Sequence, residues 1–144
     1  MPVIERWRAL LLMGFVRGEQ RSRGARLPVS LDERIPEAHL VRVIDLWVEQ
    51  VDVVRLGFAK AVPKGTGRPP YDPADLLKLY LYGDLNQIRS SRKLERESQR
   101  NIEVLWLLKR LSPDFKTIAN FRKEVAIFRI SDLLWIKSKV PRML

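Results

Sequence analysis

Hydrophobic residues recur at spacings of three and four along most of this chain, the pattern of helices that are buried on one side. The first clear run follows Pro36. Charged and amide side chains separate its apolar positions, and Gly57 provides a stop signal, so the pattern predicts a helix between these two residues. The apolar positions of this predicted helix are Leu40, Ile44, Trp47, Val48 and Val51.

A loop is predicted after this helix. Residues 61–70, AVPKGTGRPP, carry three prolines and two glycines, which a helix does not tolerate. The loop carries Lys64 and Arg68, and their charges suit a phosphate backbone.

The next helix has a clear start and an almost wholly apolar body. Asp72 is placed to cap the free amides, Pro73 suits the first turn, and Asp75 favours the positive end of the helix dipole. Apolar residues then cover most of the circumference as far as Ile88, so we expect residues 72–88 to form the central, buried helix. These residues are Leu76, Leu77, Leu79, Tyr80, Leu81, Tyr82, Leu85 and Ile88.

Three shorter helices follow, numbered second to fourth here with the central helix as the first. Ser90 or Ser91 starts a charged helix whose one strong apolar residue is Leu94, and Asn101 ends it. A third helix is expected to carry Ile102, Leu105, Trp106, Leu108 and Leu111, with Lys109 and Arg110 at its negative end. Ser112, Pro113 and Asp114 start the fourth, with Phe115, Ile118, Ala119 and Val125 turned inward. The fold class is therefore all-α, a compact bundle of short helices whose C-terminal part resembles a helix-turn-helix.

Charge changes the picture from fold to function. The 144 residues hold 27 Lys and Arg against 17 Asp and Glu, a net charge of +10, which favours nucleic acid or an anionic surface as partner. Cysteine is absent and His39 is the one histidine, so thiol catalysis and a histidine-rich metal site are excluded. We predict no cofactor and no metal.

The N-terminal part is expected to lie outside the bundle. The apolar run from Ala9 to Val16 is short and is followed by Arg17 and Gly18 rather than a cleavage site, which argues against export. Residues 18–31 are polar and without period, typical of an extended arm or linker. No segment reaches the roughly 18 apolar residues of a membrane span, so we expect a cytoplasmic protein with no membrane partner.

Basic residues concentrate on the second and fourth predicted helices. Arg92, Arg96 and Arg100 repeat every four residues, and Lys116, Asn120 and Lys123 recur on the side of the fourth helix opposite its apolar residues. Asparagine reads adenine through two hydrogen bonds, whereas arginines suit phosphates. The competing interpretation is a solvated face paired with Glu95, Glu97 and Glu103. The predicted DNA-binding residues are Arg89, Arg92, Lys93, Arg96, Arg100, Lys116, Asn120, Arg122 and Lys123.

Several segments resemble the N-terminal region of bacterial insertion-sequence transposases of the IS1182 and IS5/IS4 type. They are MGFVRGEQR, VRVIDLWVEQVDVVRLGF, GRPPYDPADLLKLYLYGDLNQIRSSRKLERE and PDFKTIANFRK, and together they span residues 13–123. The resemblance implies a helical domain that binds the terminal inverted repeats of the element and precedes a ribonuclease H-like catalytic domain.

The resemblance stops after Lys123, where EVAIFRISDLLWIKSKVPRML departs from the family pattern. The expected organisation is an extension and arm over residues 1–35, a transposase N-terminal domain over 36–123, and a divergent tail over 124–144 produced by a frameshift or truncation. The tail also has the pattern of an amphipathic helix, suited to a membrane surface or to covering exposed core.

The resemblance also bears on catalysis. Strand transfer in this family needs two Asp and one Glu that converge on metal ions, and these residues belong to the catalytic domain. The aspartates present here fit helix caps and surface charge better, so we expect no enzymatic activity. The expected function is DNA binding. The alternative is an interaction module that pairs with intact transposase as an inhibitor or with itself, or a non-functional remnant.

Overall fold

A computed structural model gives the fold and describes residues 14–22, 30–52 and 69–127. Helices account for most of these residues, and the pairing between Val16 and Tyr71 is a single isolated bridge, so the all-α prediction is confirmed. The helices are α2 (Leu31–Arg34), α3 (Leu40–Glu49), α4 (Pro73–Leu85), α5 (Ser91–Arg100), α6 (Ile102–Leu107) and α7 (Phe115–Ile127).

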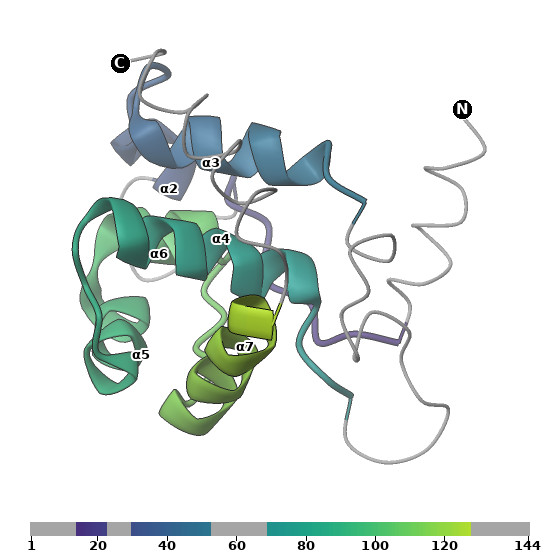
Figure 1. The fold of residues 1–144 in the computed structure, drawn as a ribbon. Helices are drawn as coiled ribbons and strands as arrows, with labels where there is room; N and C mark the ends of the chain where they lie inside the picture. Colours follow the sequence, from purple (N-terminus) through teal and green to yellow (C-terminus); the bar gives the residue numbers. More distant parts are fainter. Residues whose placement is uncertain (1–13, 23–29, 53–68, 128–144) are drawn as a thin grey trace.

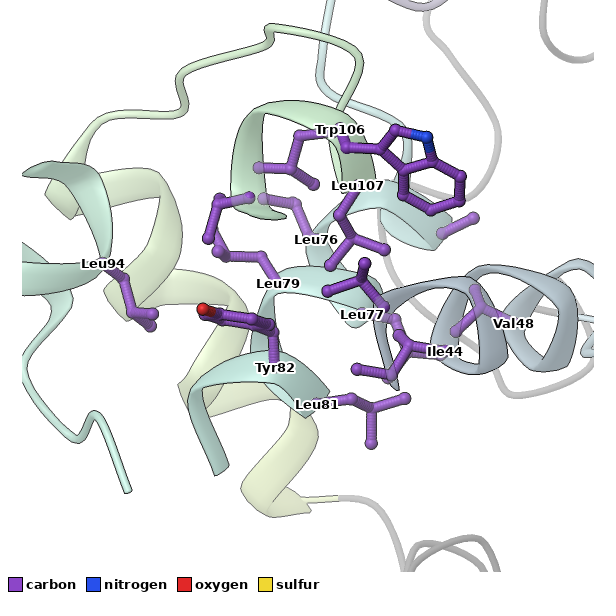
Figure 2. Close-up of a cluster of buried hydrophobic side chains, with 14 of the residues drawn as sticks. Ile44, Val48, Leu76, Leu77, Leu79, Leu81, Tyr82, Leu94, Trp106 and Leu107 are labelled. Carbon is purple, nitrogen blue, oxygen red and sulfur yellow. The ribbon is translucent and has the colours of Figure 1, made fainter. Parts of the chain in front are cut away.

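Helix α4 is the central element, as its apolar pattern predicted. The Asp72 carboxylate accepts a hydrogen bond from the Ala74 amide at 2.8 Å, which caps the helix start before Pro73. Leu77, Leu79 and Leu81 are each at most 2% exposed. In Figure 2, Leu77 and Leu81 lie beside Ile44 and Val48 of α3, and Tyr82 extends toward Leu94 of α5.

The helices form layers around α4 and α6. Helices α2 and α3 pack on one side of this pair, and α5 and α7 pack on the other (Figure 1). The core is continuous across all layers, since buried residues of α2, α3, α4, α5, α6 and α7 belong to one hydrophobic cluster. The central pair therefore holds α5 and α7 away from the N-terminal side of the molecule.

The third predicted helix is shorter than its apolar pattern suggested. Helix α6 ends at Leu107, because Lys109 and Arg110 adopt left-handed backbone with φ of 52° and 64°. The Arg110 amide donates to the Leu105 carbonyl at 2.9 Å, which closes the helix end. Apolar spacing continued through Leu108 and Leu111 because both pack against the core from the turn.

Residues 14–22 pack against the helices rather than leaving them as a free arm. The Val16 amide donates to the Pro70 carbonyl at 3.2 Å, and the Glu19 amide donates to the Lys109 carbonyl at 2.8 Å. Further along, Leu31 is 1% exposed and Ile35 is 4% exposed. The core thus includes residues that the sequence pattern assigned to the N-terminal arm.

Helix α5 buries more than its single apolar residue. Leu94 is fully buried as predicted, but Glu97 and Ser98 are buried as well. The predictions for Gly57, Lys64 and Arg68, and for most of the divergent tail, lie outside the described residues.

Candidate nucleic-acid interface

The residues predicted to contact DNA lie on two neighbouring helices and on the turn before the first. Arg89 precedes α5, which carries Arg92, Lys93, Arg96 and Arg100. Helix α7 carries Lys116, Asn120, Arg122 and Lys123. All of these side chains are exposed except Arg122, which is half-buried.

Helices α5 and α7 lie side by side and run antiparallel (Figure 1). The start of α5 meets the third turn of α7, where an Arg122 amino group donates to the Ser91 hydroxyl at 3.4 Å. The last turns of α5 meet the segment before α7, where the Ser98 and Ser112 hydroxyls lie 2.9 Å apart. The two helices therefore share one outer surface over most of their length.

The outer surface of α7 carries two lysines around an asparagine. Ile118, Phe121 and Val125 are at most 4% exposed and fix the inward side of the helix. At about 100° per residue, Lys116, Asn120 and Lys123 project from the opposite side. Their exposure in the structure agrees with the outward orientation expected from the sequence.

The outer surface of α5 continues this surface across the line of contact between the helices. The Arg92 guanidinium lies over the Phe115 ring of α7, 4.2 Å from its centroid. This cation–π contact restrains an otherwise flexible cation at the boundary of the two helices. Arg96 follows one turn later and is exposed. We call the surface formed by Arg92, Arg96, Lys116, Asn120 and Lys123 the α5–α7 face.

Arg100 has a different environment from the other arginines of α5. Its guanidinium donates to the Glu97 carboxylate at 2.7 Å, and the side-chain amide of Asn101 donates to the same carboxylate at 2.9 Å. Hydrogen bonds from Asn101 and Arg100 lower the pKa of Glu97. Arg100 therefore matches the paired-surface interpretation of this helix, although its side chain remains 68% exposed.

Arg122 is one of the predicted DNA-binding residues, but it is half-buried where the others are exposed. Its guanidinium donates to the Ile88 carbonyl at 2.9 Å and also to the Arg89 carbonyl. These partners lie in the turn between α4 and α5, so Arg122 is turned toward protein rather than outward. Its periodic position could not reveal this, because the partners are more than 30 residues away in sequence.

The residues that form these helices match a known protein family. Residues 29–124, well over half of the chain, match the transposase domain family DUF772. The chain belongs to this family. No curated protein and no solved structure matches this chain. The matched range covers every helix of the structure except the last residues of α7.

The transposase domain also contains a buried ionic network that sequence reasoning missed. The Lys78 ammonium of α4 lies 2.7 Å from the Asp45 carboxylate of α3, and the Arg21 guanidinium lies 3.0 Å from the same oxygen. Arg21 also donates to the Trp106 carbonyl at 2.7 Å and lies 4.0 Å from the centre of the Trp106 ring. The network therefore joins residues 14–22 to the helices. The one hint in the sequence was a lysine within an otherwise apolar helix.

A carboxylate beside this network has a perturbed pKa. Burial of Asp75 raises its pKa from 3.8 to about 6, and this effect exceeds the opposing attraction of the Lys78 ammonium, whose nitrogen lies 3.8 Å away. Asp75 also occupies the first turn of α4. Its charged neighbours are Lys78, Asp72, Lys109 and Asp45, none of which belongs to the α5–α7 face.

A second polar network ties the start of α3 to α6. His39 caps α3, because its Nδ1 accepts a hydrogen bond from the Val41 amide at 3.2 Å. Its Nε2 lies 3.1 Å from a Glu103 carboxylate oxygen, and the Tyr82 hydroxyl donates to the other oxygen at 2.7 Å. Burial and Glu103 raise the pKa of Tyr82. His39 therefore joins the start of α3 to Glu103 of α6.

Two features are absent from the described residues, a metal-binding cluster and a membrane-spanning helix. No group of three or more His, Cys, Asp and Glu side chains is placed to hold a metal ion within residues 14–22, 30–52 and 69–127. Over the same residues, no helix has both the length and the apolar character needed to cross a bilayer.

Proposed function

We propose that this transposase domain binds double-stranded DNA at the terminal inverted repeats of an insertion element. The observation that supports the proposal is the α5–α7 face, where two adjacent helices bring four cations and one exposed asparagine to a single surface. Asn120 on α7 is placed to read base edges in the major groove, with Lys116 and Lys123 on either side. Arg92 and Arg96 on α5 are placed to contact phosphates.

The two helices are expected to play different roles, and substitutions separate them. Arg96→Ala should weaken binding to every duplex alike and reduce the salt slope by about 0.9, because one phosphate contact is lost. Asn120→Ala should cost about 1–3 kcal/mol on the cognate repeat only. Fluorescence anisotropy with terminal-repeat and scrambled duplexes, at several salt concentrations, measures both effects.

A matched control for these variants is Arg34→Ala, which removes an exposed cation from α2 in the layer on the other side of α4 and α6. It should leave the affinity and the salt slope almost unchanged. If Arg34→Ala and Arg96→Ala had equal effects, binding would reflect net charge rather than the α5–α7 face. Salt-insensitive association with intact transposase, in place of duplex binding, would favour the protein-interaction alternative.

We also propose that this chain does not cut DNA. Three of the described aspartates have structural partners: Asp45 binds Lys78 and Arg21, Asp72 caps α4, and Asp32 accepts a hydrogen bond from the Trp106 indole at 2.9 Å. A two-metal displacement needs carboxylates that are available to metal ions. Incubation with Mg²⁺ or Mn²⁺ and a supercoiled plasmid bearing the terminal repeat should therefore give no nicking. Metal-dependent nicking that stayed with the chain through successive purification steps would contradict this proposal.

A further inference from the structure

Arg122 lies where α7 meets the turn between α4 and α5. One terminal nitrogen of its guanidinium donates to the Ile88 carbonyl at 2.9 Å, and the other donates to the Arg89 carbonyl and to the Ser91 hydroxyl. All three acceptors belong to one short stretch of chain. The planar fork of an arginine places two terminal nitrogens against such a divergent set of acceptors. A lysine has a single ammonium nitrogen and cannot match that geometry.

The turn that Arg122 grips leads directly into α5. The Ile88 amide donates back to the Gly83 carbonyl at 2.7 Å and closes α4, and the Ile88 carbonyl is bound by Arg122. Ser90 then caps α5, accepting from the Lys93 amide at 3.3 Å. The position of the first turn of α5 therefore depends on a side chain of α7.

The α5–α7 face has its second cross-link near the start of α7. There the Arg92 guanidinium stacks on Phe115, two turns of α7 before Arg122. Contacts at both positions set the spacing between the two helices. That spacing decides whether the cations of α5 can reach phosphates while Asn120 of α7 reaches base edges.

We propose that Arg122 is a positioning residue for DNA binding: it fixes α5 against α7 so that both helices engage one duplex together, and it does not itself contact DNA. This inference rests on the proposed DNA-binding function. It differs from the role expected from the sequence, in which Arg122 was one more cation facing phosphate. A positioning role predicts that the shape of the side chain matters, whereas a single exposed phosphate contact depends mainly on its charge.

The first test compares Arg122→Lys with the parent chain and with Arg96→Lys. If Arg122 positions α5, Arg122→Lys should weaken duplex binding on the order of tenfold despite its unchanged charge. Arg96→Lys keeps the charge of an exposed phosphate contact and should retain nearly all affinity. Titrations are run at a temperature where circular dichroism shows each variant to be as helical as the parent. Parental affinity in Arg122→Lys would overturn the inference.

The second test is a double-substitution cycle. Arg122→Lys loosens α5 and thereby misplaces Arg96. The factor by which Arg96→Ala weakens binding should therefore be at least about threefold smaller in the Arg122→Lys background than in the parent. The control cycle pairs Arg96→Ala with Lys123→Ala, an exposed neighbour of Arg122, and should be additive. Additive effects of Arg122→Lys and Arg96→Ala would overturn the positioning role.

The two proposals fail in different ways. If the parent chain shows no salt-dependent binding to duplex, the proposed function is wrong and the cycles have no signal to compare. If the parent binds with the expected salt dependence, while Arg122→Lys binds equally well, DNA binding stands and the positioning role alone is lost.

Discussion

Gln87 has a backbone φ of 58°, in the left-handed region that favours glycine. Its amide donates to the Asp84 carbonyl at 3.3 Å, and the next amide, of Ile88, donates to the Gly83 carbonyl at 2.7 Å. These two bonds form the Schellman arrangement that ends many helices, in which the residue at this position is usually glycine. Helix α4 thus ends through a residue that pays a conformational cost.

Gln87→Gly should raise the free energy of unfolding by about 0.5–1 kcal/mol, because it removes the strain of a side chain in left-handed backbone. Gln87 is exposed, so little packing is lost. Urea titration followed by circular dichroism measures the change. Gln87→Ala is the matched control and should give no such gain, since alanine keeps the strain. Equal stabilisation by both substitutions would show that the backbone conformation is not the cause.

Asp75 makes stability depend on pH. Its pKa is about 6 in the folded chain against 3.8 for an unperturbed group, so the folded state holds the proton more tightly. As pH rises through this window, the unfolded state ionises first and stability falls. Below the window Asp75 is protonated in both states, so its ionisation does not change the free energy of unfolding.

Asp75→Asn should therefore stabilise the domain by about 1–3 kcal/mol at pH 7 and have little effect near pH 3. Thermal or urea unfolding across this pH range, for the parent and the variant, gives the difference curve. Asp84→Asn, an exposed change on the same helix, should show a much smaller pH-dependent difference. A pH-independent effect of Asp75→Asn would contradict the raised pKa.

At the scale of elements, the attachment of residues 14–22 depends on a close approach of two backbones. A Cβ added at Gly18 would lie 2.3 Å from the Lys109 Cβ and 2.6 Å from the Lys109 carbonyl oxygen. Lys109 is in the left-handed turn that ends α6 and accepts the Glu19 amide. The early end of α6 therefore creates the place where the N-terminal segment docks.

Gly18→Ala should displace this segment and lower the free energy of unfolding by about 1–3 kcal/mol, since neither backbone can move without breaking the contact between them. Hydrogen exchange of the Glu19 amide should become much faster, while amides within α4 keep their protection. Gln20→Ala, an exposed change in the same segment, should alter neither. Unchanged exchange at Glu19 in Gly18→Ala would mean that the close approach tolerates a methyl group.

At the scale of the whole molecule, α4 and α6 separate two surfaces of different character. On one side, α2, α3 and residues 14–22 hold paired charges. Arg21 pairs with Asp45 at 3.0 Å, and Arg42 pairs with Asp32 at 3.7 Å. On the other side, the α5–α7 face presents cations to solvent. Among the described residues, the fold thus gathers exposed cations on one surface, which composition alone could not predict.

The sequence by itself determined the features that depend on near neighbours. Caps at Asp72, Ser90 and Asn101 mark helix starts because each side chain bonds an amide two or three residues away. Helical spacing placed Leu94 inward and Lys116, Asn120 and Lys123 outward for the same local reason. The class of fold and most of the candidate surface follow from these short-range rules.

Tertiary structure alone decided the features that join distant parts of the chain. Arg122 binds carbonyls 33 and 34 residues away, and Arg21 binds the Trp106 carbonyl 85 residues away. Such partners leave no periodic trace, because a long cation looks the same in sequence whether it faces solvent or protein. The antiparallel contact of α5 and α7 is also of this kind. It is what combines two separate basic helices into one surface.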